Sequence, residues 1–284
     1  MEIFESIKSA INSGFSTSLI GGGIGAIAGA YAAAKITSQK SEIDRNTNLL
    51  ENLNITIFQT HTALNHLISF KIQFANNLFQ KYFIDRVRYF YAMNISSSNL
   101  YISIDQLLFE YQSIPLDRLS EYCAKIGGTP RLWAALHQIE VADKNLSSLI
   151  LKRKNDPYKF QSMPKKEFLQ NYFGSLDNKS NTLYPDIIKS IKETLDDAIF
   201  FCYIIFKELQ LTQKNIRSST FVKNNPKIFS QIKDHGISMS TRAKSHIPSP
   251  RYYKLWLPSY PRNLIKRTIN KKSFIERVHH LFKR

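Results

Sequence analysis

The chain has 284 residues, a formal net charge of +17 at pH 7 and 43% hydrophobic side chains. This apolar content is enough to bury a core, so the composition excludes wholesale disorder. At about 150 residues per domain, the length allows one or two domains. Two cysteines without a CxxC spacing exclude a disulfide scaffold.

A short N-terminal segment, residues 1–14, precedes the most apolar run of the chain, residues 15–36. Roughly twenty residues of this run carry no charge, which is enough for one helix to cross a bilayer core of about 30 Å. We therefore predict a single transmembrane helix over residues 15–36. Lys35, Lys40 and Arg45 follow the run and only Lys8 precedes it, so the positive-inside rule favours the cell inner membrane with the C-terminal domain in the cytoplasm.

Small residues recur at every fourth position of this run. They are Gly21, Gly25, Gly29 and Ala33. On a helix they form one smooth face that lets a second helix approach closely, so we predict membrane-helix packing and a homo-oligomer. The self-associated helices could also line a pore. The simplest alternative is that this face has no role in packing, because small residues are common in membrane helices in general.

Two other interpretations of the run stay open. Residues 28–30, Ala-Gly-Ala, could serve as the cleavage site of a signal peptide, although the leader is not positively charged. The run could also be an Ala/Gly-rich helix packed inside a water-soluble protein.

Residues 37–220 carry the pattern of a helical bundle. From 38 to 91, apolar residues recur at spacings of three and four without a proline. Further helices are expected over about 130–155, with Thr129 as the cap, over 165–173, and from Pro185 to about 216. The predicted fold class is all-α.

The bundle offers little chemistry. We interpret Asp196 and Asp197 as a solvated shoulder of the last helix, and Glu140 and Asp143 as surface carboxylates. No phosphate-binding loop, zinc-protease motif or nucleophile elbow occurs, and no histidine or cysteine spacing fits a metal site. We therefore expect no cofactor, no metal and no catalytic residue, which leaves a dispersed enzymatic site as the alternative.

Two segments resemble a known group of proteins. Residues 104–110, IDQLLFE, are followed by a loop, an apolar helix and residues 151–155, LKRKN, which close with Arg153 and Asn155. This arrangement, over about residues 15–155, resembles uncharacterised bacterial single-pass membrane proteins. The resemblance implies a glycine- or alanine-rich anchor followed by an all-helical cytosolic domain, and it carries no active site to transfer.

Residues 221–284 form a basic arm. Fifteen Lys or Arg stand here against Asp234 and Glu276, with aromatic side chains among them, and the last twenty residues follow an amphipathic helical pattern. Such a segment is expected to bind anionic lipid or nucleic acid. The alternative is a solvated tail whose aromatic side chains pack back on the bundle. The candidate binding residues are Arg251, Lys254, Trp256, Arg262, Lys266, Arg267, Lys271, Lys272 and Arg277.

The sequence thus predicts a membrane-anchored helical interaction protein. We expect a self-associating sensor or effector, by analogy of phage-defence or stress type, whose basic arm docks on the lipid bilayer and whose protein partner is unknown. The alternative is a nucleic-acid-binding protein that uses the same arm.

Overall fold

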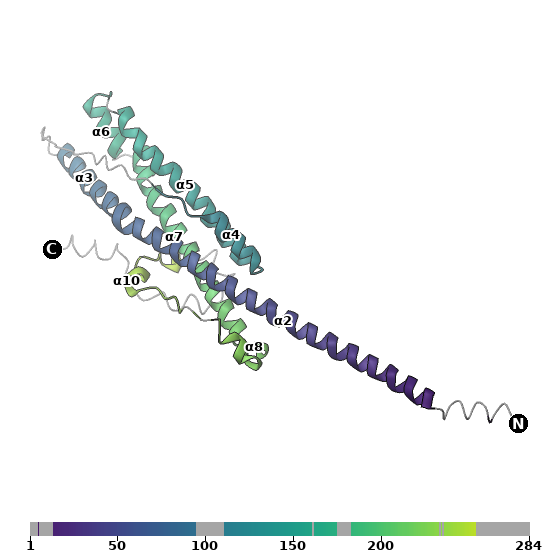
Figure 1. Cartoon of the computed structure of the whole chain (residues 1–284). Coiled ribbons are helices and arrows are strands. Elements are labelled where there is room, and N and C mark those ends of the chain that lie inside the picture. The colour runs from purple at the N-terminus through teal and green to yellow at the C-terminus, as the bar shows by residue number, and fades with distance from the viewer. Residues whose placement is uncertain are drawn as a thin grey trace. The chain divides into compact units, whose positions relative to one another are not determined.

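A computed structural model describes residue 5 and residues 14–94, 111–160, 162–174, 183–232, 234 and 236–253 (Figure 1). For residues 14–25, 94, 156–160 and 183 it describes the backbone alone. Every regular element in these ranges is a helix, and no strand occurs in them. The prediction of an all-α protein is therefore confirmed.

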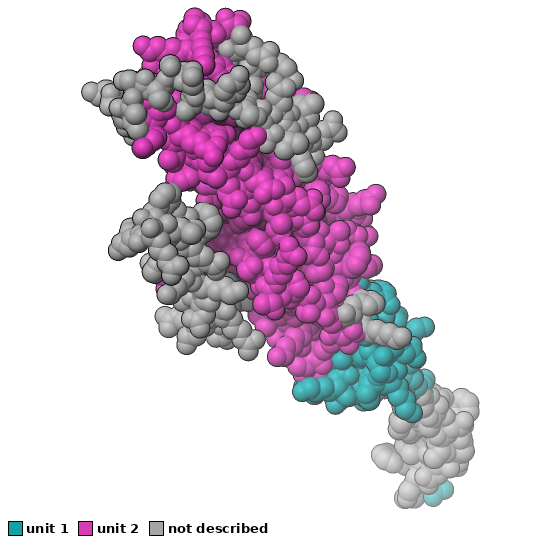
Figure 2. Space-filling view, turned by 90° about the vertical axis from the view of Figure 1, so that its left-hand side faces the viewer, with its two compact units in different colours: residues 1–51, 220–232 teal, residues 52–219, 233–284 magenta. Residues whose placement is uncertain are grey.

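The chain divides into two compact units (Figure 2). Unit 1 comprises residues 1–51 and 220–232, and unit 2 comprises residues 52–219 and 233–284. Both units therefore draw on two separate stretches of sequence. The first segment of the predicted basic arm, residues 221–232, belongs to unit 1, and the rest is assigned to unit 2.

A long helix, α2 (Gly14–Phe70), runs through the sequence of both units. It continues into one π-helical turn, η1 (Lys71–Ala75), and then into α3 (Asn76–Asn94). No proline interrupts residues 14–94, so nothing in the sequence removes a backbone N–H from this helix. The wide turn at Lys71 is the one departure from regular α geometry along it, and such turns are frequent at functional sites.

Unit 1 contains the N-terminal part of α2 and two short helices, α8 (Thr220–Asn224) and α9 (Pro226–Phe229). The rings of Phe221 and Phe229 lie 6.2 Å apart in a T-shaped arrangement. Pro226 occupies the first turn of α9, where its missing N–H costs no hydrogen bond.

Unit 2 is built around α5 (Pro130–Phe160) and α7 (Leu183–Arg217), which pack along each other. Two shorter helices, α4 (Leu116–Lys125) and α6 (Lys165–Phe173), pack against α5 and α7 respectively. The second half of α2 also faces α7, because the thiol of Cys202 lies 3.5 Å from the carbonyl oxygen of Thr60. The fully buried core includes Leu53, Leu64, Leu67, Ile139, Leu146, Ile188, Ile191, Phe200 and Phe206.

Helix boundaries follow local sequence signals. The hydroxyl oxygen of Thr129 accepts a hydrogen bond from the Leu132 N–H at 3.3 Å, which confirms the predicted cap of α5. Helix α6 spans the predicted residues 165–173. By contrast α5 runs through the predicted break at Pro157 and ends at Phe160.

Candidate functional site

The predicted packing face lies on the exposed part of α2. Gly29 and Ala33 are exposed, and a methyl group built on Gly29 would meet no atom within 4 Å. The side-chain surroundings of Gly21 and Gly25 lie outside the described residues, although the backbone there is helical. The alternative of a helix packed inside a globule does not hold for the described turns.

Large apolar side chains share this exposed stretch. Ile27 is 73% exposed, Tyr31 71% and Ile36 65%, and every residue from 26 to 42 is exposed. No helix among the described residues combines the length and the apolarity needed to cross a bilayer. Residues 26–42 are nevertheless the longest exposed stretch of helix in the described chain.

Most of the predicted basic site falls beyond the described chain. Arg251 is exposed on the short 3₁₀ helix η2 (Pro250–Tyr253), beside Tyr252, which is 72% exposed. The remaining predicted residues lie outside the described residues: Lys254, Trp256, Arg262, Lys266, Arg267, Lys271, Lys272 and Arg277.

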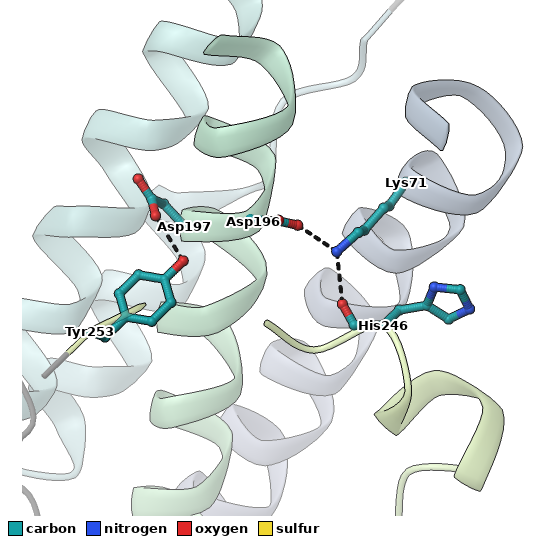
Figure 3. A network of polar contacts seen from close by, with 5 residues as sticks. All are labelled: Lys71, Asp196, Asp197, His246 and Tyr253. Atoms are coloured by element: carbon teal, nitrogen blue, oxygen red, sulfur yellow. Dashed lines mark hydrogen bonds and ion pairs between the residues drawn. The ribbon is translucent and has the colours of Figure 1, made fainter. Parts of the chain in front are cut away.

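The basic arm contacts α7 of unit 2 through Tyr253. Its ring stacks on Phe200 with the centroids 3.7 Å apart and the planes within 3° of parallel. Its hydroxyl donates a hydrogen bond of 2.8 Å to Asp197 (Figure 3). Burial raises the pKa of the Asp197 carboxyl, and the hydrogen bond from Tyr253 partly offsets that rise. Asp197 is therefore a docking group of the bundle rather than a solvated shoulder, contrary to the prediction.

A second contact holds the same segment on the π-helical turn. The Lys71 ammonium pairs with the Asp196 carboxylate and donates a hydrogen bond of 2.9 Å to the backbone oxygen of His246 (Figure 3). Both charged side chains are mostly buried, at 13% and 26% exposure. Burial lowers the pKa of His246, and the nearby charges of Lys71 and Arg242 lower it further. The sequence offered no signal for Lys71, because its partners lie far away along the chain.

Another buried carboxylate was predicted at the surface. Asp143 is 5% exposed and accepts hydrogen bonds from the Tyr111 hydroxyl, at 2.6 Å, and from the Ile114 N–H, at 3.2 Å. It joins α5 to the residues that lead into α4. Glu140, by contrast, is exposed and pairs with Lys144 one turn away, as a surface carboxylate does.

A cavity of about 380 Å³ opens in unit 2 at the C-terminal end of α7. Hydrogen bonds between its lining residues hold its walls: Gln213 donates to the Asn54 side-chain oxygen, and Gln210 donates to the Ile237 carbonyl at 2.8 Å. In the wall formed by Asp234, Gly236 and Ile237, the Gly236 N–H donates a hydrogen bond of 3.1 Å to the Asp234 carboxylate. Gly236 has a φ of +54°, which a residue with a side chain adopts only under strain.

The cysteines and the possible metal ligands of the described chain form no reactive or metal-binding site. Cys123 and Cys202 are buried free thiols, and burial raises the pKa of each to about 12, so both stay protonated and unreactive at neutral pH. Within the described ranges no three His, Cys, Asp or Glu side chains gather as a metal site would require.

Comparison of the chain with protein-family models, with curated proteins and with solved structures finds no match.

Proposed function

We propose that this chain is a membrane-tethered helical interaction protein, in which residues 15–36 lie in the bilayer and the helical bundle that follows them in the sequence works next to the membrane surface. The observation that carries the proposal is the exposure of an apolar helix: Ile27, Tyr31 and Ile36 project from turns that nothing in the described chain covers. An extended apolar surface of this kind is typical of a site that binds lipid or another protein.

Lipid suits these residues for a backbone reason. Each glycine costs an isolated helix in water about 1 kcal/mol relative to alanine, and residues 21–29 contain five glycines. In hydrocarbon the backbone has no water to bond with, so its hydrogen bonds must stay within the helix. A bilayer therefore stabilises a helix that water would tend to fray.

The charge of the arm supports the same location. Tyr253 is docked on α7, and the most basic part of the arm follows it in the sequence. Residues 254–284 carry nine Lys or Arg and one Glu. Near an anionic membrane each basic residue contributes about 1 kcal/mol to binding. Because the anchor would hold the chain at the membrane, lipid headgroups would be the phosphates closest to the arm.

Self-association and the sensor or effector role are parts of this proposal that rest on the helix pattern and on analogy. The stripe that begins at Gly21 would bring two copies together within the bilayer. The double variant Gly25→Leu/Gly29→Leu should reduce crosslinking between copies of the chain in membranes, measured with a reagent that does not react with cysteine. Its matched control, Ala26→Leu/Ala30→Leu, adds the same bulk to a neighbouring face and should crosslink as the wild type does.

Fractionation without detergent tests the anchor. We expect the wild-type chain to sediment with membranes and to resist a carbonate wash. The variant Ile27→Arg should weaken insertion by about 3 kcal/mol and shift protein to the supernatant. Phe58→Arg, on the same helix at an exposed position beyond the run, is the control. Recovery of the wild type in the soluble fraction would overturn the anchor.

A second candidate function, nucleic-acid binding, is favoured by one observation. Exposed Arg251 and Tyr252 stand side by side at the root of the arm, and cations interleaved with rings can neutralise phosphates and stack on bases. A chain that ends at Tyr253 and also carries Arg251→Gln and Tyr252→Ala separates the two candidates, because it lacks the basic and aromatic groups that either partner would contact. Loss of binding to phosphatidylglycerol vesicles supports lipid as the target, whereas loss of salt-sensitive RNA binding supports the second function.

A further inference from the structure

The cavity at the end of α7 carries chemistry that membrane tethering does not use. Its volume of about 380 Å³ lies within the range of small-molecule sites. Ile57 and Ile237 supply apolar lining, and the remaining lining groups other than Gly236 are carboxamides or charged side chains. Because polar side chains outnumber the apolar ones in this lining, the cavity suits a polar ligand.

Two cations stand on one wall of this cavity. Lys214 and Arg217 are three residues apart on α7, so they project from the same face of the helix. Two positive charges on the same wall favour an anionic ligand over a neutral one. The flat guanidinium of arginine matches two oxygens of a phosphate, and the lysine ammonium adds a point charge.

The other walls offer hydroxyl-binding groups. Asp234 provides a carboxylate, which accepts hydrogen bonds from hydroxyls, and the carboxamides of Asn54 and Gln213 can donate and accept. These groups are pre-positioned, because Gln213 bonds to Asn54 and Asp234 bonds to the Gly236 N–H. Side chains held in place before binding lose less entropy when a ligand arrives.

We propose that this cavity binds a small phosphorylated polyol. The phosphate lies between Lys214 and Arg217, and the hydroxyls of the ligand reach Asp234 and the carboxamide pair. The chemistry is shared by two sources, a soluble phosphate ester and the glycerophosphate headgroup of a lipid. The inference does not depend on the membrane anchor, since all lining residues belong to unit 2.

Calorimetric titration of the full chain tests the site with two probes, glycerol 3-phosphate and dihexanoyl phosphatidylglycerol below its micelle concentration. Binding of the first alone assigns a soluble ligand, and stronger binding of the second assigns the headgroup. Glycerol without phosphate should not bind. The site does not exist if neither probe binds at concentrations up to about 10 mM.

Charge-matched variants separate the cavity from general attraction to a cationic chain. Lys214→Gln should weaken probe binding by at least about tenfold. Lys189→Gln removes the same charge from an exposed position of the same helix and should leave binding unchanged. Equal losses in the two variants would overturn the proposal. Asp234→Asn should weaken glycerol 3-phosphate but spare inorganic phosphate, and circular dichroism should show that each variant folds.

Discussion

The two halves of helix α2 have the same backbone and opposite surroundings. Residues 26–42 are exposed throughout, whereas residues 50–70 alternate between exposed positions and fully buried ones such as Leu53, Leu64 and Leu67. In the second half leucines recur at helical spacing and are buried, and Thr60 and His61 of this half contact α7, while residues 26–42 of the first half are covered by nothing in the described chain. Helix formation and burial are therefore separate outcomes.

The comparison is tested most severely by truncating one apolar side chain in each half. Leu64→Ala removes a fully buried side chain and should lower the free energy of unfolding by about 2–5 kcal/mol. Ile27→Ala, at 73% exposure, should change it by less than about 0.5 kcal/mol. Urea unfolding of both variants measures the difference, and equal losses would show that Ile27 is buried in the folded protein.

The ion pair on the π-helical turn should give the next largest effect. Lys71→Met keeps the aliphatic stem but leaves Asp196 and the His246 carbonyl without their shared donor, so we expect a loss of about 2 kcal/mol. Lys35→Met, in the exposed half, is the control. Thermal unfolding measures both. A loss under about 0.5 kcal/mol for Lys71→Met would mean that water replaces the pair at little cost.

Two threonines make the same local hydrogen bond in the two halves. The Thr60 hydroxyl donates to the Thr56 carbonyl, and the Thr37 hydroxyl donates to the Ala33 carbonyl, both at 2.8 Å. Thr60 is fully buried, so Thr60→Ala should cost about 1–2 kcal/mol through the lost methyl and hydroxyl contacts. Thr37→Ala should be neutral or slightly stabilising, because alanine is the better helix former. Chemical denaturation distinguishes these outcomes.

The smallest expected effect comes from the burial of the Glu208 carboxyl on α7. Burial raises the pKa of Glu208, and Arg131, 3.9 Å away, partly offsets this. A carboxyl whose pKa is raised on folding binds more protons in the folded state, so its contribution to stability falls as pH rises from the unfolded to the folded pKa.

The variant Glu208→Gln should therefore be more stable than the wild type at pH 7.5, by less than about 1 kcal/mol. The advantage should disappear toward pH 4, where the wild-type carboxyl is protonated. Unfolding curves at a series of pH values measure it. If the wild type instead gained stability relative to the variant as pH rises, the Arg131 pair would outweigh burial, and a difference that does not change with pH would show that the two effects cancel.

The sequence alone determined the elements of this protein. Spacings of three and four predicted the helices, Thr129 predicted the cap of α5, and the borders of α6 followed from its flanking residues. These features depend on interactions within a few residues, which periodicity and capping rules describe. Helical spacing also predicted that Gly29 and Ala33 share one face of the helix, whereas their exposure is a finding of the structure.

Only the tertiary structure decided which polar residues are buried and what they hold. Asp143 and Asp197 looked like surface carboxylates, yet they bind Tyr111 and Tyr253 from distant parts of the chain. The cavity likewise combines α2, α7 and the segment that follows Ile232. The burial of a charged side chain depends on partners that the fold brings together, here across 32 and 56 residues, and no local pattern records such contacts.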